Sequence, residues 1–173
     1  MGEVKKEARI RMVRNRICRL LTFLPAVCMA CLIFGFSAQT GEESSSLSRQ
    51  VTEGLVRAVD QITGSGWTEE EVQEQAERYE IYVRKAAHMT EYAVFAVTVL
   101  LPLRGCGFRG RRLFLITALV CASFAAGDEW HQSFVGGRGP SAADVGIDFT
   151  GACIGMGAAG VFLRRRKKAR GKG

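Results

Sequence analysis

The sequence predicts an all-α fold: a four-helix transmembrane bundle with a short amphipathic helical extracytoplasmic loop. Three observations support this fold class: four apolar blocks, the gathering of Lys and Arg into alternate gaps between them, and helical periodicity in the one long polar segment. Helices are expected because backbone groups in lipid must find hydrogen bonds within their own segment. With 173 residues, the chain is expected to form one domain over residues 1–173.

The four apolar blocks have the length that a bilayer requires. We expect spans at about residues 17–36, 86–103, 113–131 and 142–163. A helix of about 20 residues crosses a hydrocarbon core of about 30 Å. The third block loses its apolar character after Gly127, so its span must either tilt or continue further along the chain.

The positions of Lys and Arg predict the orientation of the spans. Of the 24 Lys and Arg residues, 18 lie in the N-terminal head, in the turn between the second and third spans, or in the tail over residues 164–173. These 18 residues are Lys5, Lys6, Arg9, Arg11, Arg14, Arg16, Arg19, Arg104, Arg109, Arg111, Arg112, Arg164, Arg165, Arg166, Lys167, Lys168, Arg170 and Lys172. Four spans place all three segments on one side. Because cytoplasmic segments are enriched in Lys and Arg, we expect a multi-pass protein of the cell membrane with both termini in the cytoplasm.

The basic tail and the first apolar block each allow an interpretation other than a membrane-flanking segment and a membrane span. A net charge of +7 and a basic tail could indicate a nucleic-acid arm or a lipid-binding patch. A basic segment flanking the last span explains the tail without either, so no nucleic acid is expected as a partner. The first block could be a cleaved signal peptide, since Ser37 and Ala38 supply small residues after it. Its length and the need for an even number of spans favour its retention.

The segment between the first two spans, residues 37–85, is acidic and lies outside the cell in this orientation. We expect a Ser-rich linker over residues 40–48, followed by a short helix over residues 49–62 whose apolar residues recur at helical spacing. Such a helix would lie on the membrane surface or cap the bundle.

A second helix is predicted after the glycines that end the first one. Thr68 and Glu71 form a capping-box pattern, and the helix that they begin is expected to run through Val83 into the second span. None of the six cysteines lies in this acidic segment, so no disulfide framework is expected there. Cys28 and Cys31 form a CxxC motif, but their apolar neighbours favour small buried residues of a membrane helix.

Ionisable residues inside spans are costly in lipid, and three groups of them fall at the outer face in the expected topology. The first group, at the start of the second span, contains Lys85, His88 and Glu91. His88 and Glu91 are three residues apart and therefore share a helix face. A hydrogen bond between helices is the structural alternative to a functional site here.

The second group ends the third span and contains Asp128, Glu129, His131 and Gln132. Carboxylates beside an imidazole are suited to proton transfer or to binding a divalent metal, although the spacing of a known zinc helix is absent. The alternative is a polar cap at the interface, with Trp130 as a membrane-surface anchor.

The third group surrounds the glycine-rich turn before the fourth span. The guanidinium of Arg138 suits a carboxylate or a phosphate, while Asp144 and Asp148 lie four residues apart on one helix face. An ion pair between Arg138 and one of these acids is the plain alternative. Gly151 and Gly155 then allow close packing of the fourth helix.

These segments resemble the VanZ-like family of small bacterial membrane proteins. The matching stretches are residues 33–39, 84–88, 91–92, 128–132 and 137–138, together with Asp144 and Gly151. They run from the first span to the last in the family's order. One departure is Asp148, where much of the family has Asn, so the pocket carries an additional carboxylate. The family is named for a protein linked to low-level teicoplanin resistance, which is a family label and not a prediction for this chain.

A polar, partly buried, outward-facing pocket explains the three groups more simply than packing alone. We expect it to bind an anionic cell-envelope lipid, a lipid-linked wall precursor or a glycopeptide. The residues expected to bind this ligand are Lys85, Gln132, Arg138, Asp144 and Asp148.

The alternative is a membrane-embedded enzyme that acts on a lipid-linked envelope substrate by acid–base or metal-assisted chemistry. Its candidate catalytic residues are His88, Glu91, Glu129 and His131, and the candidate ligands of a divalent metal are Asp128, His131 and Asp144. A transporter is disfavoured, because four spans are few and the polar groups lie at one face.

Overall fold

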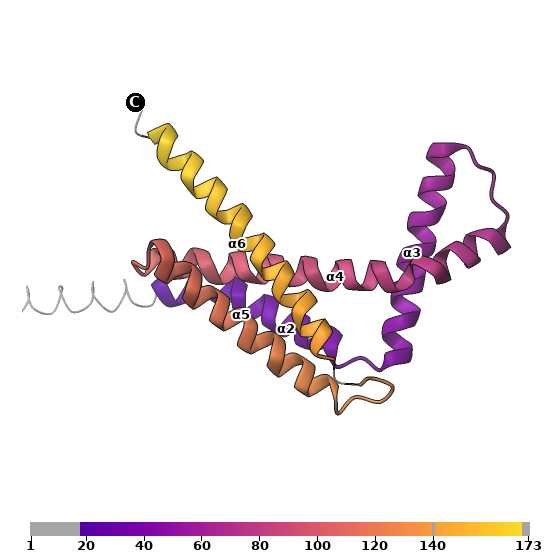
Figure 1. Ribbon diagram of the computed structural model, residues 1–173, viewed down its shortest axis with the longest axis horizontal. Coiled ribbons are helices and arrows are strands. Elements are labelled where there is room, and N and C mark those ends of the chain that lie inside the picture. The colour runs from indigo at the N-terminus through magenta and orange to yellow at the C-terminus, as the bar shows by residue number, and fades with distance from the viewer. Residues whose placement is uncertain (1–17, 140, 171–173) are drawn as a thin grey trace, which may run out of the picture.

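The computed structural model describes residues 18–139 and 141–170. The start of the first expected span at Ile17, the head residues Lys5 to Arg16 and the tail residue Lys172 lie outside the described residues. In Figure 1 the rest of the chain forms helices joined by short loops, as the sequence predicted. The helices are α2 (Leu24–Ser37), α3 (Gly41–Thr63), α4 (Glu69–Gly105), α5 (Gly110–Gln132) and α6 (Ala142–Arg170).

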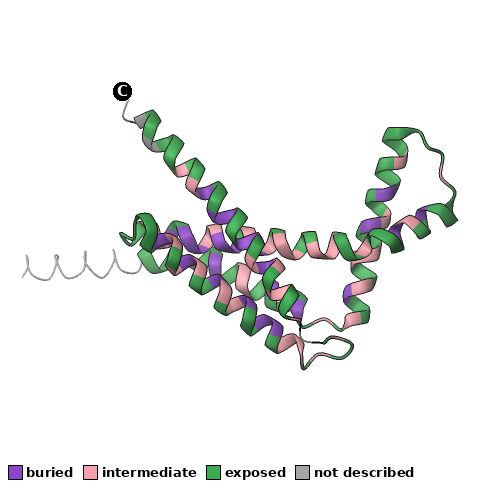
Figure 2. Ribbon diagram, viewed as in Figure 1, coloured by how far each residue is buried: buried purple, intermediate pink, exposed green. Residues whose placement is uncertain are grey.

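Four helical segments are long and apolar enough to cross a membrane. They are Cys18–Ser37, Glu69–Gly105, Gly110–Gln132 and Ala142–Arg166. Their outer surfaces are apolar: Leu20 on the first segment is 70% exposed and Leu119 on the third is 69% exposed. Figure 2 shows the exposed residues along the outside of these helices and the buried ones facing their neighbours. Apolar surface of this extent is unusual for a protein surrounded by water and confirms a multi-pass membrane protein.

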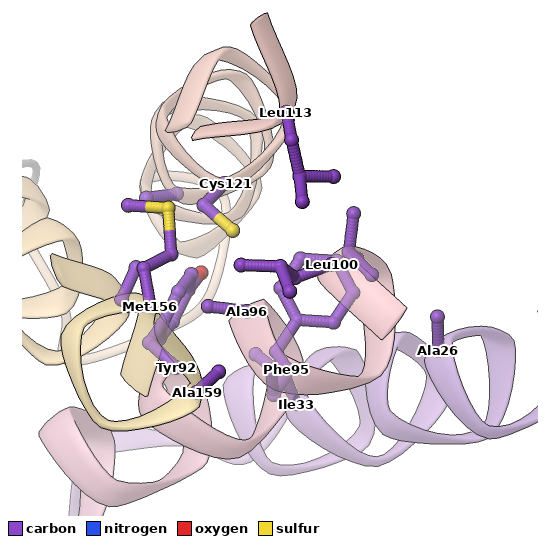
Figure 3. Close-up of a cluster of buried hydrophobic side chains, with 13 residues drawn as sticks. Ala26, Ile33, Tyr92, Phe95, Ala96, Leu100, Leu113, Cys121, Met156 and Ala159 are labelled. Carbon is purple, nitrogen blue, oxygen red and sulfur yellow. The ribbon is translucent and has the colours of Figure 1, made fainter. Parts of the chain in front are cut away.

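Helix α4 is the centre of the bundle, because it contacts α2, α3, α5 and α6. The core gathers around its residues Tyr92, Phe95, Ala96 and Leu100, all of which are buried. Figure 3 shows side chains from α2, α5 and α6 converging on this part of α4. The third span continues past Gly127 to Gln132, as its short apolar block required.

Helices α4 and α6 approach so closely that no side chain fits between them at two positions. A Cβ atom placed on Gly151 would overlap the backbone of Met89, and one placed on Gly155 would overlap the backbone of Ala93. The predicted role of these glycines in close packing is therefore confirmed.

The expected linker over residues 40–48 is wrong, because helix α3 begins at Gly41. Thr40 and Glu43 form a capping box in which each side chain accepts a hydrogen bond from the backbone N–H of the other residue. The hydroxyls of Ser45 and Ser48 accept hydrogen bonds from Arg84 of α4, which ties this first part of α3 to α4. Ser48 donates to the carbonyl of Ser44 at 2.8 Å.

The link between α3 and α4 follows the predicted signals. Gly64 ends α3 with a left-handed backbone (φ 67°), which glycine adopts without strain. Thr68 caps α4 with Glu71 in a second capping box, and α4 then continues as one helix of 37 residues into the span. Arg57 of α3 makes two hydrogen bonds, at 2.8 and 2.6 Å, to the carboxylate of Glu69 at the start of α4.

The ends of the helices fall into two sets in Figure 1. The α4–α5 turn, the beginning of α2 and the C-terminal end of α6 lie at one end of the bundle. The α2–α3 connection and the α5–α6 loop lie at the opposite end, beside the part of α4 that α3 crosses. Most of the described basic residues therefore lie at the end opposite to the α5–α6 loop.

The close approach of α4 and α6 predicts a contrast between two glycines of the same helix. Gly155→Ala should lower the free energy of unfolding by about 1–3 kcal/mol, because the new methyl group forces the helices apart. Gly157→Ala is the matched control, since a Cβ there meets no atom within 4 Å. The thermal midpoint of the detergent-purified protein measures both. Equal midpoints for the two variants would contradict the packing described here.

Candidate functional site

A polar cavity of about 670 Å³ lies where the beginning of α3, the middle of α4, the end of α5 and the beginning of α6 meet. We call it the polar cavity. Its wall is completed by the α5–α6 loop. Seven of the predicted site residues line it: Lys85, His88, Glu129, Gln132, Arg138, Asp144 and Asp148. The structure thus brings together one or more residues from each of the three predicted groups.

Two of the three cations that line the polar cavity have acidic partners. Arg84 pairs with Glu80 one turn earlier on α4, and it also donates a hydrogen bond of 2.6 Å to the hydroxyl of Ser45 on α3. The ammonium of Lys85 lies 3.8 Å from the carboxylate of Asp144 on α6. These contacts tie α4 to α3 on one side of the cavity and to α6 on the other.

Arg138 is the cation without a partner. Its guanidinium forms no ion pair or side-chain hydrogen bond with the residues that the structure describes, so the predicted alternative of a pair with Asp144 or Asp148 is wrong. Burial and the nearby guanidinium of Arg84 lower the pKa of Arg138, whereas Asp128 and Glu129 act in the opposite direction. Two guanidinium groups therefore face one cavity, and only one of them has an ion-pair partner.

His88 lies at the inner wall of the cavity between two carboxylates. Its Nδ1 atom is 3.9 Å from a carboxylate oxygen of Glu91 and 4.0 Å from one of Asp148 on α6. This nitrogen is buried and has no hydrogen-bond partner among the described residues. The contact with Asp148 depends on the close crossing of the helices, since Met89, the next residue, packs against Gly151.

Glu129 and three glycines position the loop that closes the cavity. A carboxylate oxygen of Glu129 accepts a hydrogen bond of 2.5 Å from the backbone N–H of Ser141, at the beginning of α6. The backbone N–H of Gly41 donates to the carbonyl of Gly136 at 3.1 Å. A Cβ on Gly41 would overlap the backbone of Gly137, so this seam between α3 and the loop requires glycine.

Asp128 does not line the cavity but is buried between α2, α4 and α5, with an exposure of 1%. Its Oδ2 atom accepts hydrogen bonds from the hydroxyl of Ser37 at 2.7 Å and from the amide of Gln132 at 3.2 Å. The hydroxyl of Tyr92 lies 3.5 Å from the same oxygen. Gln132 also donates to the Ser37 hydroxyl at 2.5 Å, so this network joins the ends of α2 and α5.

His131 is also turned away from the cavity. Its ring packs on that of Phe34 of α2, with 4.2 Å between the ring centroids. Asp128, His131 and Asp144 are therefore not brought together, and no group of three or more His, Cys, Asp or Glu side chains within residues 18–139 and 141–170 is arranged to hold a metal ion. The three residues were predicted as one set because helix spacing alone does not reveal which face each of them occupies.

A second, smaller cavity of about 200 Å³ adjoins the polar cavity between α2, α3 and α4. We call it the apolar cavity, because five of its lining residues are apolar: Phe36, Leu47, Val51, Val83 and Ala87. Glu91, a predicted catalytic residue, lines this cavity and not the larger one. Arg84, His88 and Arg138 line both cavities, so the two spaces share one wall.

Three residues with clear roles in the site were not among the predicted site residues. Arg84 lines both cavities, while Ser37 and Tyr92 bond to the buried Asp128. Each lies inside a segment that the sequence had already singled out. Arg84 could have been found from the sequence, because it is a second basic residue directly before Lys85. Ser37 could be recognised only as a polar residue at the end of an apolar span.

The fold and the site define a small multi-pass membrane protein with a polar cavity at one end of its helical bundle. The chain belongs to the VanZ/LLP1 family, whose sequence profile matches residues 22–163. This stretch includes all four spans apart from their outermost turns, and all the candidate site residues. The predicted family resemblance is therefore confirmed. No curated protein and no solved structure matches the chain.

The buried network predicts an order of stability among three variants. Asp128→Ala should lower the free energy of unfolding by about 1–3 kcal/mol, because it leaves the buried hydroxyl of Ser37 without its acceptor and removes one of the two acceptors of the Gln132 amide. Ser37→Ala should have an intermediate effect. Tyr92→Phe should have the smallest, about 1 kcal/mol or less, since its hydroxyl is at the limit of bonding distance. Thermal unfolding in detergent measures the order, and a Tyr92→Phe variant less stable than Asp128→Ala would contradict it.

Proposed function

We propose that this protein binds the anionic headgroup of a cell-envelope lipid or lipid-linked wall precursor in its polar cavity, on the outer face of the membrane. The supporting observation is the guanidinium of Arg138, which faces an open cavity of about 670 Å³ beside Arg84 and has no acidic partner in the described residues. Like charges at one wall repel each other, and an anion between them relieves this repulsion.

The remaining lining narrows the chemistry of the headgroup. Four acidic residues line the same cavity as the cations, so its wall is mixed in charge: Glu42, Glu129, Asp144 and Asp148. A headgroup that fits such a wall has one anionic group for the arginines and also hydrogen-bond donors, such as hydroxyls or an amine, for the carboxylates. A phosphate ester of glycerol, of an amino alcohol or of a sugar has both features.

The outward orientation is part of the proposal, and it rests on the distribution of Lys and Arg. In a variant without other cysteines, Ser65→Cys in the α3–α4 loop should react with a membrane-impermeant maleimide added to intact cells. A variant that retains only the native Cys106, which is exposed at the α4–α5 turn, should react only after the cells are permeabilised. The opposite result would place the polar cavity on the cytoplasmic side.

Binding through Arg138 predicts a loss of affinity for phosphate-bearing lipids. Arg138→Ala should weaken binding of phosphatidylglycerol by roughly 10- to 100-fold, because a charge-assisted hydrogen bond contributes about 1.5–3 kcal/mol. Native mass spectrometry of the purified protein, titrated with phosphatidylglycerol, measures this change. Dioleoylglycerol, which lacks the phosphate, should bind weakly to both proteins.

Arg78→Ala is the matched control, since Arg78 is an exposed arginine of the same outer region that lines neither cavity. It should bind phosphatidylglycerol as the wild type does. Equal weakening by both substitutions would show that the effect is general surface charge, and unchanged binding by Arg138→Ala would remove the proposed site.

A second candidate function is a membrane-embedded enzyme, and one observation favours it. His88 lies between Glu91 and Asp148 at the wall shared by both cavities, which is a suitable place for proton transfer to or from a bound headgroup. The same mass spectra separate the two functions: turnover would convert a bound lipid to one of different mass, and His88→Gln would prevent this conversion.

A further inference from the structure

We propose that the ligand is an intact membrane lipid whose hydrocarbon chain enters the apolar cavity while its headgroup occupies the polar cavity. This inference rests on the proposed function and names the class of its ligand. It commits to a lipid as the source of the anionic group, in place of a free phosphate ion or another soluble anion.

The first argument is the shared wall of the two cavities. Arg84, His88 and Arg138 line both of them, so a molecule held by these residues reaches both spaces at once. On one side of this wall the lining is rich in charged and hydrogen-bonding groups. On the other side, five apolar side chains gather beside Gln39, Ser44, Ser48 and Glu91. A ligand that satisfies both sides is amphipathic, with its charged group at the arginines.

The second argument is the size and exposure of the apolar cavity. Its volume of about 200 Å³ is below the roughly 300–1,000 Å³ of a site that encloses a whole small-molecule ligand. It therefore suits one segment of a longer chain. Leu47 and Val51 of α3, which form part of its wall, are 43% and 50% exposed, so the cavity is open along that helix.

The third argument is the apolar stripe that continues from the cavity along α3. Leu47, Val51, Leu55 and Val59 follow one another at intervals of four residues, and all of them are exposed. Because Leu47 and Val51 share the cavity wall with Phe36 at the end of the first span, the stripe begins at the bundle itself. Hydrocarbon chains of the bilayer are the apolar molecules available to such a surface.

The test compares two phosphatidylglycerols that differ only in chain length. The full-length protein in neutral detergent is mixed with equal amounts of the dihexanoyl and dioleoyl forms, and native mass spectrometry gives the ratio of long to short lipid bound. Ala87→Trp fills the apolar cavity and should lower this ratio by about fourfold for each methylene that the cavity buries in the oleoyl chain and not in the hexanoyl chain. Partition into the micelle is the same for all variants and cancels.

Ala86→Trp is the matched control, because Ala86 is the neighbouring exposed alanine and lines neither cavity. It should keep the wild-type ratio. Arg138→Ala should weaken the binding of both lipids, because both carry the same anionic headgroup. Binding of the dihexanoyl form by Ala87→Trp shows that this variant is folded.

If Ala87→Trp loses both lipids, Val51→Gln replaces it, with Val59→Gln as its control. Both valines are about half exposed on α3, and only Val51 lines the apolar cavity. These substitutions change the exposed face of one helix and leave the bundle core unaltered.

The outcomes separate this inference from the proposed function. If the wild type and the cavity-filled variant show the same long-to-short ratio, the proposal that a lipid chain occupies the apolar cavity is overturned. Binding of the short lipid that depends on Arg138 would still support the headgroup site. Inorganic phosphate that displaces both lipids equally well would also overturn it, because the chain would then add nothing. Binding of both lipids that does not depend on Arg138 overturns the two proposals together.

Discussion

The close contact between α4 and α6 is the constraint on which the rest of the structure depends. Gly151 and Gly155 allow the backbones of the two helices to touch at Met89 and Ala93. That contact sets the register between the helices, and the register brings His88 within 4.0 Å of Asp148. It also brings Lys85 within 3.8 Å of Asp144, one turn nearer the beginning of α6. In lipid there is little hydrophobic force between helices, so close packing of this kind has to hold them together.

A second feature is the difference between two neighbouring carboxylates. Asp128 and Glu129 follow each other on α5, but a rotation of about 100° per residue turns them to different sides of the helix. Asp128 points into the bundle and joins α5 to α2 through Ser37. Glu129 points to the cavity and fixes the beginning of α6 through the N–H of Ser141. One acid therefore holds the bundle together, and its neighbour shapes the site.

Much of the fold could be predicted from the sequence, because apolar blocks and capping patterns are local signals. The four spans, the capping box at Thr68 and the continuous α4 followed from them. The first turns of α3 did not, since a run of serines is also typical of a linker. What makes it a helix is the cap at Thr40 together with contacts from Arg84, which lies 36 residues beyond Ser48. A contact between residues so far apart in the chain cannot be predicted from the composition of either segment.

The site was predicted in part, and for the same physical reason. Seven expected residues line the polar cavity, because ionisable groups in spans turn away from lipid and towards one another. Which of them meet depends on the register between helices, and single-sequence patterns do not contain it. Asp128 and His131 were accordingly assigned to the pocket, although each faces α2. The role of Ser37 could not be seen without the acid that it binds.

The position of Asp128 has a consequence for how the chain is assembled in the bilayer. The last turn of α5 carries two acids that are buried in the folded protein, and a buried acid without partners is strongly disfavoured in hydrocarbon. By itself this helix is a poor insertion substrate. Asp128 has its complete set of donors only when α5 is packed against the first span, which supplies the hydroxyl of Ser37.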